Sequence, residues 1–166
     1  MFKRTLLICS AMLLVSACAS KKDGVDGSLD AGMDPSMSAD GGMGGAPVPG
    51  TQEDLVVNVG DRVLFGYDSY DLSPEGRTTL ENQAAWLGQY GSLSVVIEGH
   101  ADERGTREYN LALGERRANA VKNYLTTLGV DPSRISTVSS GKERPAVEGS
   151  DESAWAQNRR GVTTVQ

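Results

Sequence analysis

The chain has 166 residues, with 16 basic and 22 acidic side chains, and its formal net charge is −6. This length allows one modest folded domain with tails. The acidic balance disfavours a nucleic-acid-binding protein, because a surface that binds nucleic acid needs positive charge to neutralise phosphates. Aromatic residues make up only 5% of the sequence, so any core must be mostly aliphatic.

Residues 1–17 are predicted to be a secretory signal peptide. Lys3 and Arg4 precede an apolar stretch that ends in small residues before Cys18. The stretch is too short to span a bilayer, which takes about 20 apolar residues. Cleavage before Cys18 would also remove Cys9, so no internal disulfide is expected.

The residues before Cys18 resemble a bacterial lipobox, with Val15 where leucine is usual. The resemblance implies cleavage before Cys18, a diacylglyceryl thioether on its sulfur and an acylated amino group. Two or more acyl chains anchor a protein stably, whereas one is marginal. Ala19, rather than aspartate, follows the cysteine, which resembles the outer-membrane address of enteric lipoproteins. The alternative for Cys18 is a free thiol or an intermolecular disulfide.

Residues 18–52 are expected to form the lipidated N-terminus and a disordered linker. Gly, Asp, Ser, Met, Ala and Pro dominate this segment, which therefore cannot bury enough apolar surface to offset its ordering entropy. Such a coil typically spans roughly 30–35 Å, and its stretched limit is about 110–120 Å. Met33, Met37 and Met43 could form a soft-metal site, but a low-complexity linker is the simpler interpretation.

Residues 53–166 are expected to form one α+β domain. Apolar runs predict a first strand at 62–68 and later strands at 93–97, 134–140 and 161–165, with 55–59 as an edge strand or a lead-in. Capping signals predict helices from Ser73 to about 90, from Thr106 to about 128, and from Ser150 or Asp151 through Trp155. The order β-α-β-α-β-α-β predicts a two-layer sandwich with one mixed sheet. The last strand begins at Gly161 and is predicted to be weak or frayed.

The strongest functional signal is the segment 99–117, GHADERGTREYNLALGERR, which contains the only histidine. On a helical wheel, at about 100° per residue, Arg117 and Asn110 fall near the middle of the apolar face that includes Leu113. A guanidinium that faces a core is costly unless an anion and enough acceptors meet it. Asp102, in the preceding loop, is one candidate partner for Arg117, and the carboxylate of an external ligand is another.

Four motifs, GHADERGTREYN, GERRANAVKNYL, ISTVSSGKERP and WAQNRR, closely resemble the OmpA-like C-terminal domain family. The resemblance covers residues 53–166 and implies four strands, of which the last is antiparallel to the others. Family members usually have Phe-Asp-Phe-Asp or a similar sequence where this chain has FGYD at 65–68. Gly66 therefore stands in place of the first aspartate, and the second is retained as Asp68. A turn role is the alternative for Asp68.

The same resemblance implies that Asp102 and Arg117 hold the free amino-acid end of diaminopimelate in peptidoglycan. An aspartate accepts hydrogen bonds from an ammonium, and an arginine fork grips a carboxylate. Asn110 would order the loop or touch the ligand, and Thr106 and Arg104 are weaker candidates near the mouth. The alternative is that Asp102 and Arg117 only pair with each other. Replacing either with alanine is expected to abolish wall binding and leave the fold intact.

The resemblance further implies a binding module without a cofactor, which docks to the Tol system, notably TolB, and takes part in envelope constriction during division. One alternative is a scaffold with the same fold that binds only proteins. Another is a wall-cleaving hydrolase with Asp102 and Glu103 as its acid and base. The sequence has no nucleophile motif, P-loop or GxGxxG. His100 is expected to be a hydrogen-bonded loop residue rather than a metal ligand.

Overall fold

The computed structural model describes residues 46–166. The predicted signal peptide, Cys18 and the three linker methionines lie outside the described residues. Within residues 46–166, no helix is both long enough and apolar enough to cross a membrane. The strands are β1 (Arg62–Leu64), β2 (Val95–His100), β3 (Ile135–Gly141) and β4 (Arg160–Val165). The helices are α1 (Gln52–Asp54), α2 (Pro74–Gln89), α3 (Arg107–Thr127) and α4 (Glu152–Asn158), with a π-helical turn at Leu55–Val59 and a 3-10 turn at Pro132–Arg134.

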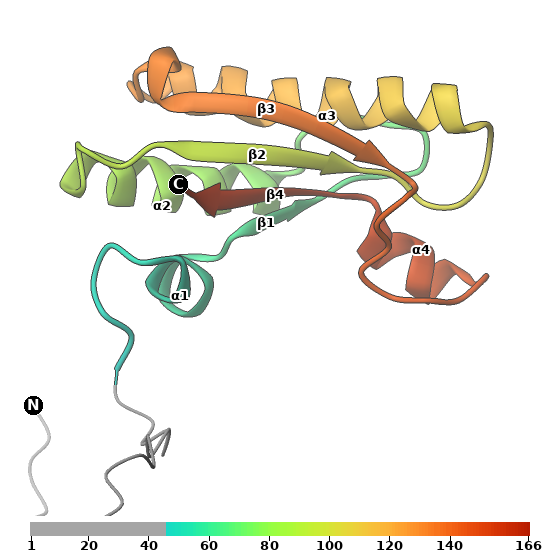
Figure 1. The fold of residues 1–166 in the computed structure, drawn as a ribbon, viewed down its shortest axis with the longest axis horizontal. Helices are drawn as coiled ribbons and strands as arrows, with labels where there is room; N and C mark the ends of the chain where they lie inside the picture. The colour runs from blue at the N-terminus through green and yellow to red at the C-terminus, as the bar shows by residue number, and fades with distance from the viewer. Residues whose placement is uncertain (1–45) are drawn as a thin grey trace, which may run out of the picture. The chain divides into compact units, whose positions relative to one another are not determined.

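The four strands form one mixed sheet in the order β1-β4-β2-β3. β2 and β3 are parallel, and β4 is antiparallel to both of its neighbours, so β1 and β2 run in the same direction with β4 between them. Helices α2 and α3 lie side by side along the sheet, and α4 lies at its end, in the connection from β3 to β4 (Figure 1). The predicted α+β two-layer sandwich is confirmed.

The last strand is internal, and the prediction that it would be weak or frayed was wrong. Val162 is opposite Arg62 on one side and Glu98 on the other. The hydroxyl of Thr163 also donates to the side-chain oxygen of Gln83 at 2.9 Å. A short, polar strand is stable here because both of its edges are hydrogen-bonded, and composition does not reveal that.

The apolar run at 55–59 is helical, so the edge-strand alternative was wrong and the run is a lead-in. The hydroxyl of Thr51 accepts from the amide of Asp54 at 3.3 Å, and the amide of Gly60 donates to the carbonyl of Leu55 at 2.8 Å. The Asp54 carboxylate accepts from the indole of Trp86 at 2.8 Å, which joins the lead-in to α2. Trp86 is itself buried.

Both long helices begin at the predicted caps. The hydroxyl of Ser73 accepts from the amide of Gly76 at 3.1 Å, and that of Thr106 accepts from the amide of Tyr109 at 3.2 Å. The helices and the sheet enclose an aliphatic core. Its most buried members are Leu55, Val63, Leu80, Leu87, Val95, Ile97, Ala118, Val121, Leu125 and Ile135.

Two facing glycines let the backbone of α3 rest directly on β2. A Cβ on Gly114 would lie 2.7 Å from the carbonyl oxygen of Gly99, and a Cβ on Gly99 would overlap the carbonyl of Gly114. Arg117 follows about one turn later in α3, and helical side chains tilt toward the helix N-terminus. The close approach therefore allows Arg117 to reach the carboxyl end of β2.

Candidate functional site

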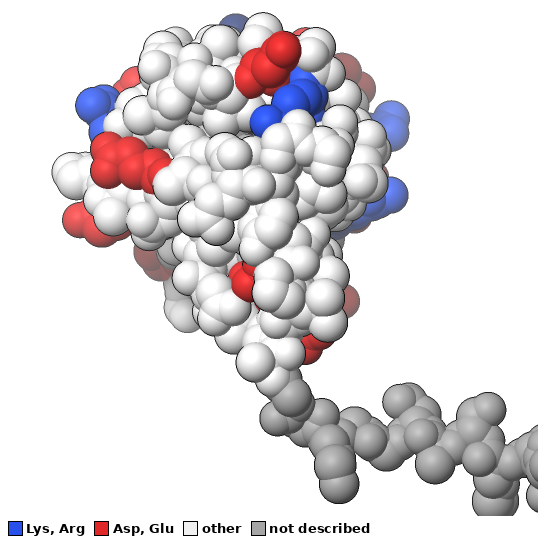
Figure 2. All heavy atoms as spheres, turned by 90° about the vertical axis from the view of Figure 1, so that its left-hand side faces the viewer, with Lys and Arg blue, Asp and Glu red and all other residues white. Residues whose placement is uncertain are grey.

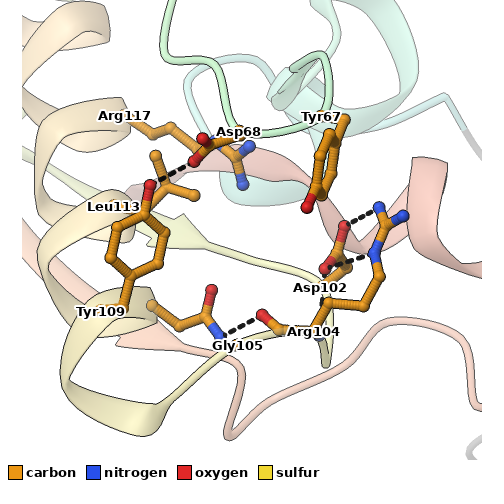
Figure 3. Close-up of a pocket in the computed structure, with 9 residues that line it drawn as sticks. Tyr67, Asp68, Asp102, Arg104, Gly105, Tyr109, Leu113 and Arg117 are labelled. Carbon is orange, nitrogen blue, oxygen red and sulfur yellow. Dashed lines mark hydrogen bonds and ion pairs between the residues drawn. The ribbon is translucent and has the colours of Figure 1, made fainter.

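A pocket of about 200 Å³ opens where α3 begins, beside the ends of β1 and β2. Side chains from the loop after β1, the loop after β2 and the first turns of α3 converge on it (Figure 3). The lining residues are Tyr67, Asp68, Asp102, Arg104, Gly105, Tyr109, Asn110, Leu113 and Arg117.

Arg117 lies at the inner end of the pocket and is fully buried. Its guanidinium donates to three backbone carbonyls: Ser69 at 2.8 Å, His100 at 2.7 Å and Gly66 at 3.0 Å. Burial lowers the pKa of Arg117 to about 10, so the side chain is still charged at neutral pH. A guanidinium has five N–H groups, and three are used here, so two have no hydrogen-bond partner within residues 46–166.

Asp102 does not pair with Arg117, so the predicted alternative of direct pairing was wrong. Its carboxylate accepts from the Arg104 backbone amide at 3.1 Å and from the Arg104 guanidinium at 2.6 and 3.2 Å. Arg159 approaches the same carboxylate at 3.4 Å. Burial alone would raise the pKa of Asp102, but these hydrogen bonds and charges hold it below its ordinary value. The structure brings Asp102 and Arg117 to one pocket without a bond between them.

Asp68 lies on the opposite wall of the pocket, where it accepts a hydrogen bond from the Tyr109 hydroxyl (Figure 3). Its φ is +50°, a conformation that residues other than glycine rarely adopt. The turn after β1 therefore bends at Asp68 and directs a carboxylate at the pocket. The turn role and the pocket role proposed for Asp68 are compatible.

The guanidinium of Arg104 is held between two aromatic rings. Its central carbon lies 4.2 Å from the ring centre of Tyr67 and 4.0 Å from that of Trp155 in α4. Cation–π contacts of this kind contribute about 0.5–2 kcal/mol each. The Asn110 amide donates to the Arg104 carbonyl at 2.8 Å, which fixes the loop from the other side.

The pocket contains two carboxylates, Asp68 and Asp102, and two guanidinium groups, Arg104 and Arg117, so its formal charges cancel. Such a set can bind a zwitterion, because ammonium and carboxylate each find a partner.

The pKa of Glu103 is lowered by hydrogen bonds from Ser150 and Trp155, and the pKa of Asp102 is also held below its ordinary value. A hydrolytic pair needs one carboxyl with a raised pKa, which neither group has. Residues 46–166 also contain no group of three or more His, Cys, Asp or Glu side chains placed to share a metal ion.

Comparisons with known proteins agree with this fold. The model of the OmpA family matches residues 64–159. A peptidoglycan-associated lipoprotein of Mesorhizobium japonicum is 50% identical over 157 residues, which covers 93% of this chain and 87% of the relative. The peptidoglycan-associated lipoprotein of Pseudomonas aeruginosa is 43% identical over 160 residues, which covers 96% of this chain and 94% of the relative. The chain belongs to the OmpA family and groups with the peptidoglycan-associated lipoproteins.

Solved structures support the same assignment. One is the crystal structure of the peptidoglycan-associated lipoprotein from Burkholderia pseudomallei, whose sequence is 43% identical and whose fold matches with a TM-score of 0.62. The match covers 64% of this chain and 90% of the Burkholderia chain. The C-terminal domain of Helicobacter pylori MotB is 20% identical with a TM-score of 0.59, which shows a shared fold alone.

Five of the six candidate binding residues of this OmpA-family domain line the pocket: Asp68, Asp102, Arg104, Asn110 and Arg117. Thr106 does not, since its hydroxyl is used to cap α3.

Sequence reasoning missed Tyr67, Tyr109 and Arg159. The two tyrosines each adjoin a residue that was singled out, and Arg159 stands in the WAQNRR motif, so motif position could have indicated all three. Arg159 is buried and donates to the carbonyl of Phe65 at 3.1 Å as well as approaching Asp102.

His100 is the last residue of β2 rather than a loop residue, and its Nδ1 has no hydrogen-bond partner. Burial, followed by the charge of Arg160, lowers the pKa of His100 from 6.5 to about 4. The unfolded chain therefore binds a proton near pH 6.5 that the folded domain does not bind until about pH 4, so stability falls as the pH drops through this window.

We expect the free energy of unfolding to decrease by about 2 kcal/mol between pH 7 and pH 5. Urea denaturation at several pH values measures this, and His100→Gln should remove most of the slope, because His100 is the only histidine. An equal slope in the variant would contradict the assignment.

Proposed function

We propose that this chain is an outer-membrane lipoprotein that binds peptidoglycan noncovalently through the pocket at the start of α3. In this proposal Cys18 carries the lipid, residues 18–52 form the linker, and the folded domain grips the diaminopimelate side chain of the wall peptide. The protein thereby tethers the outer membrane to the cell wall. The names of the relatives, which associate them with peptidoglycan and call them lipoproteins, support both ends of the tether.

The observation that carries the proposal is the paired arrangement of opposite charges in the pocket. Arg117 has two unused N–H groups at the inner end, where a ligand carboxylate would complete its hydrogen bonding. Asp102 and Asp68 supply acceptors for an ammonium on either side. The free end of diaminopimelate has this combination on a single carbon, so one small group satisfies both charges.

Co-sedimentation with purified cell-wall sacculi tests the proposal. Asp102→Asn should weaken binding about 10- to 100-fold, since a charge-assisted hydrogen bond contributes about 1.5–3 kcal/mol. Asp71→Asn is the matched control, because Asp71 is exposed and lies outside the pocket. Walls with lysine in place of diaminopimelate should bind poorly, as lysine lacks the second carboxylate.

Three outcomes would oppose this account. Full binding by a folded Asp102→Asn variant would reject the site. Equal binding to both wall types would favour the scaffold that binds only proteins. Release of soluble wall fragments over time would indicate a hydrolase.

We also propose that the domain docks to the Tol system, notably TolB, and acts in envelope constriction during division. Two tyrosines that line the pocket have large exposed fractions, 66% for Tyr67 and 48% for Tyr109, and Tyr70, which follows in the same loop, is 47% exposed. Tyrosine is enriched at protein interfaces, because it combines apolar area with a hydroxyl. A partner seated on these rings would share the surface with the wall peptide.

A further inference from the structure

A second depression lies on α3, beyond the turn that contains Asp68. It has a volume of about 330 Å³ and is open to solvent. Its lining residues are Tyr70, Arg116, Asn119, Ala120 and Asn123. The four residues from α3 are spaced at i, i+3, i+4 and i+7, so they share one face of the helix.

Arg116 is the only arginine within residues 46–166 whose guanidinium makes no hydrogen bond or ion pair with the protein. By contrast, even the exposed Arg107 and Arg144 each pair with a glutamate, at 3.2 Å. The amides of the depression are also available. Asn123 makes no side-chain hydrogen bond to the described residues, and Asn119 only accepts one from Thr137 at 3.4 Å. The depression therefore presents the unpaired guanidinium of Arg116 and the amide N–H groups of the two asparagines, which donate no hydrogen bond to the described residues.

The second depression adjoins the main pocket. Arg116 and Arg117 are consecutive, and on a helix about 10–12 Å across, an angle of 100° places their side-chain ends roughly 8–9 Å apart. Arg116 also lies near Tyr109, which lines the main pocket. The hydrogen bond to Asp68 raises the pKa of Tyr109, and the charge of Arg116 partly opposes that rise. One ligand of moderate length could reach both sites.

We propose that this depression is a second subsite, in which Arg116 binds a second carboxylate of the same wall peptide and the asparagines bind its amide groups. In diaminopimelate-type peptides the preceding residue is a glutamate joined through its side chain, so its α-carboxylate is free. The bonds between this α-carboxylate and the carboxylate at the free end of diaminopimelate span roughly 12 Å when extended. That length is enough to bridge the gap between the guanidinium groups of Arg116 and Arg117. This inference rests on the proposed function of the main pocket.

Calorimetric titration of the full chain with three ligands tests the inference. The ligands are diaminopimelate alone, the tripeptide L-Ala-γ-D-Glu-diaminopimelate, and the same tripeptide with the glutamate α-carboxylate amidated. Arg116→Gln should weaken binding of the tripeptide about 5-fold, the upper range for an exposed ion pair, and leave diaminopimelate binding unchanged. The amidated tripeptide should bind the wild type and Arg116→Gln with the same affinity. Arg144→Gln is the control, because it removes an exposed arginine that lines neither site.

The results separate the two proposals. If diaminopimelate binds but Arg116→Gln leaves tripeptide affinity unchanged, the second subsite is rejected and the main pocket stands. An equal loss for the free and amidated tripeptides would also reject it, since the effect would not depend on the carboxylate. If diaminopimelate and the tripeptides fail to bind the wild type, the proposed function itself fails.

Discussion

Replacing Arg117 with alanine is expected to remove wall binding and also to destabilise the domain by about 3–5 kcal/mol. The guanidinium is fully buried and donates to the carbonyls of Gly66 and Ser69 in the loop after β1 and to that of His100 at the end of β2. Without it, three acceptors at the inner end of the pocket lose their donor. Urea denaturation measures the loss of stability, and co-sedimentation with sacculi measures binding.

Two further variants make this result interpretable. Arg117→Lys keeps the charge but not the planar fork, so it should lose less stability than alanine and still lose most binding. Arg116→Ala should leave stability within about 0.5 kcal/mol, because its side chain is exposed and makes no ion pair. A stable Arg117→Ala domain would show that the three carbonyls do not depend on this residue.

This expectation replaces the one from the sequence, in which alanine at Arg117 would leave the fold intact. A helical wheel places the guanidinium on the inner face but cannot identify the groups that meet it. The acceptors are carbonyls brought together by the fold, so Arg117 organises the pocket and also lines it. Asp102→Asn is therefore the cleaner test of binding.

The second large effect is expected for Gly99→Ala, which should destabilise the domain by at least about 3 kcal/mol. The new Cβ would overlap the backbone carbonyl of Gly114, and neither β2 nor α3 can move without repacking the core. The change should also weaken wall binding, because α3 positions Arg117. Thermal and urea denaturation, followed by circular dichroism, measure the loss.

Gly88→Ala is the matched control, since Gly88 lies in α2 and a Cβ there meets no atom within 4 Å. This substitution should stabilise the domain by about 0.5–1 kcal/mol through helix propensity. If Gly99→Ala cost less than about 1 kcal/mol, the close approach of α3 to β2 would not be a requirement of the fold.

Local signals in the sequence were enough for the helices and for most of the site. Ser73 and Thr106 cap α2 and α3 as predicted, because a cap depends on only a few neighbouring residues. The motifs around Asp102 and Arg117 are enough to indicate the OmpA family. Asp102, Asn110 and Arg117 do meet in one pocket, since the loop and the first turns of a helix are close in the chain.

Other features depend on residues that are far apart in the sequence. The interior place of β4 arises from pairing with β1 and β2, and the composition of residues 160–165 carries no record of those partners. The pairing of Asp102 with Arg159 joins residues 57 positions apart. The sequence by itself determined the two long helices, the approximate places of the four strands along the chain, the family and the principal charged residues. Only the tertiary structure decided the strand order and the partner of each charge, because long-range pairing depends on how all the elements pack together.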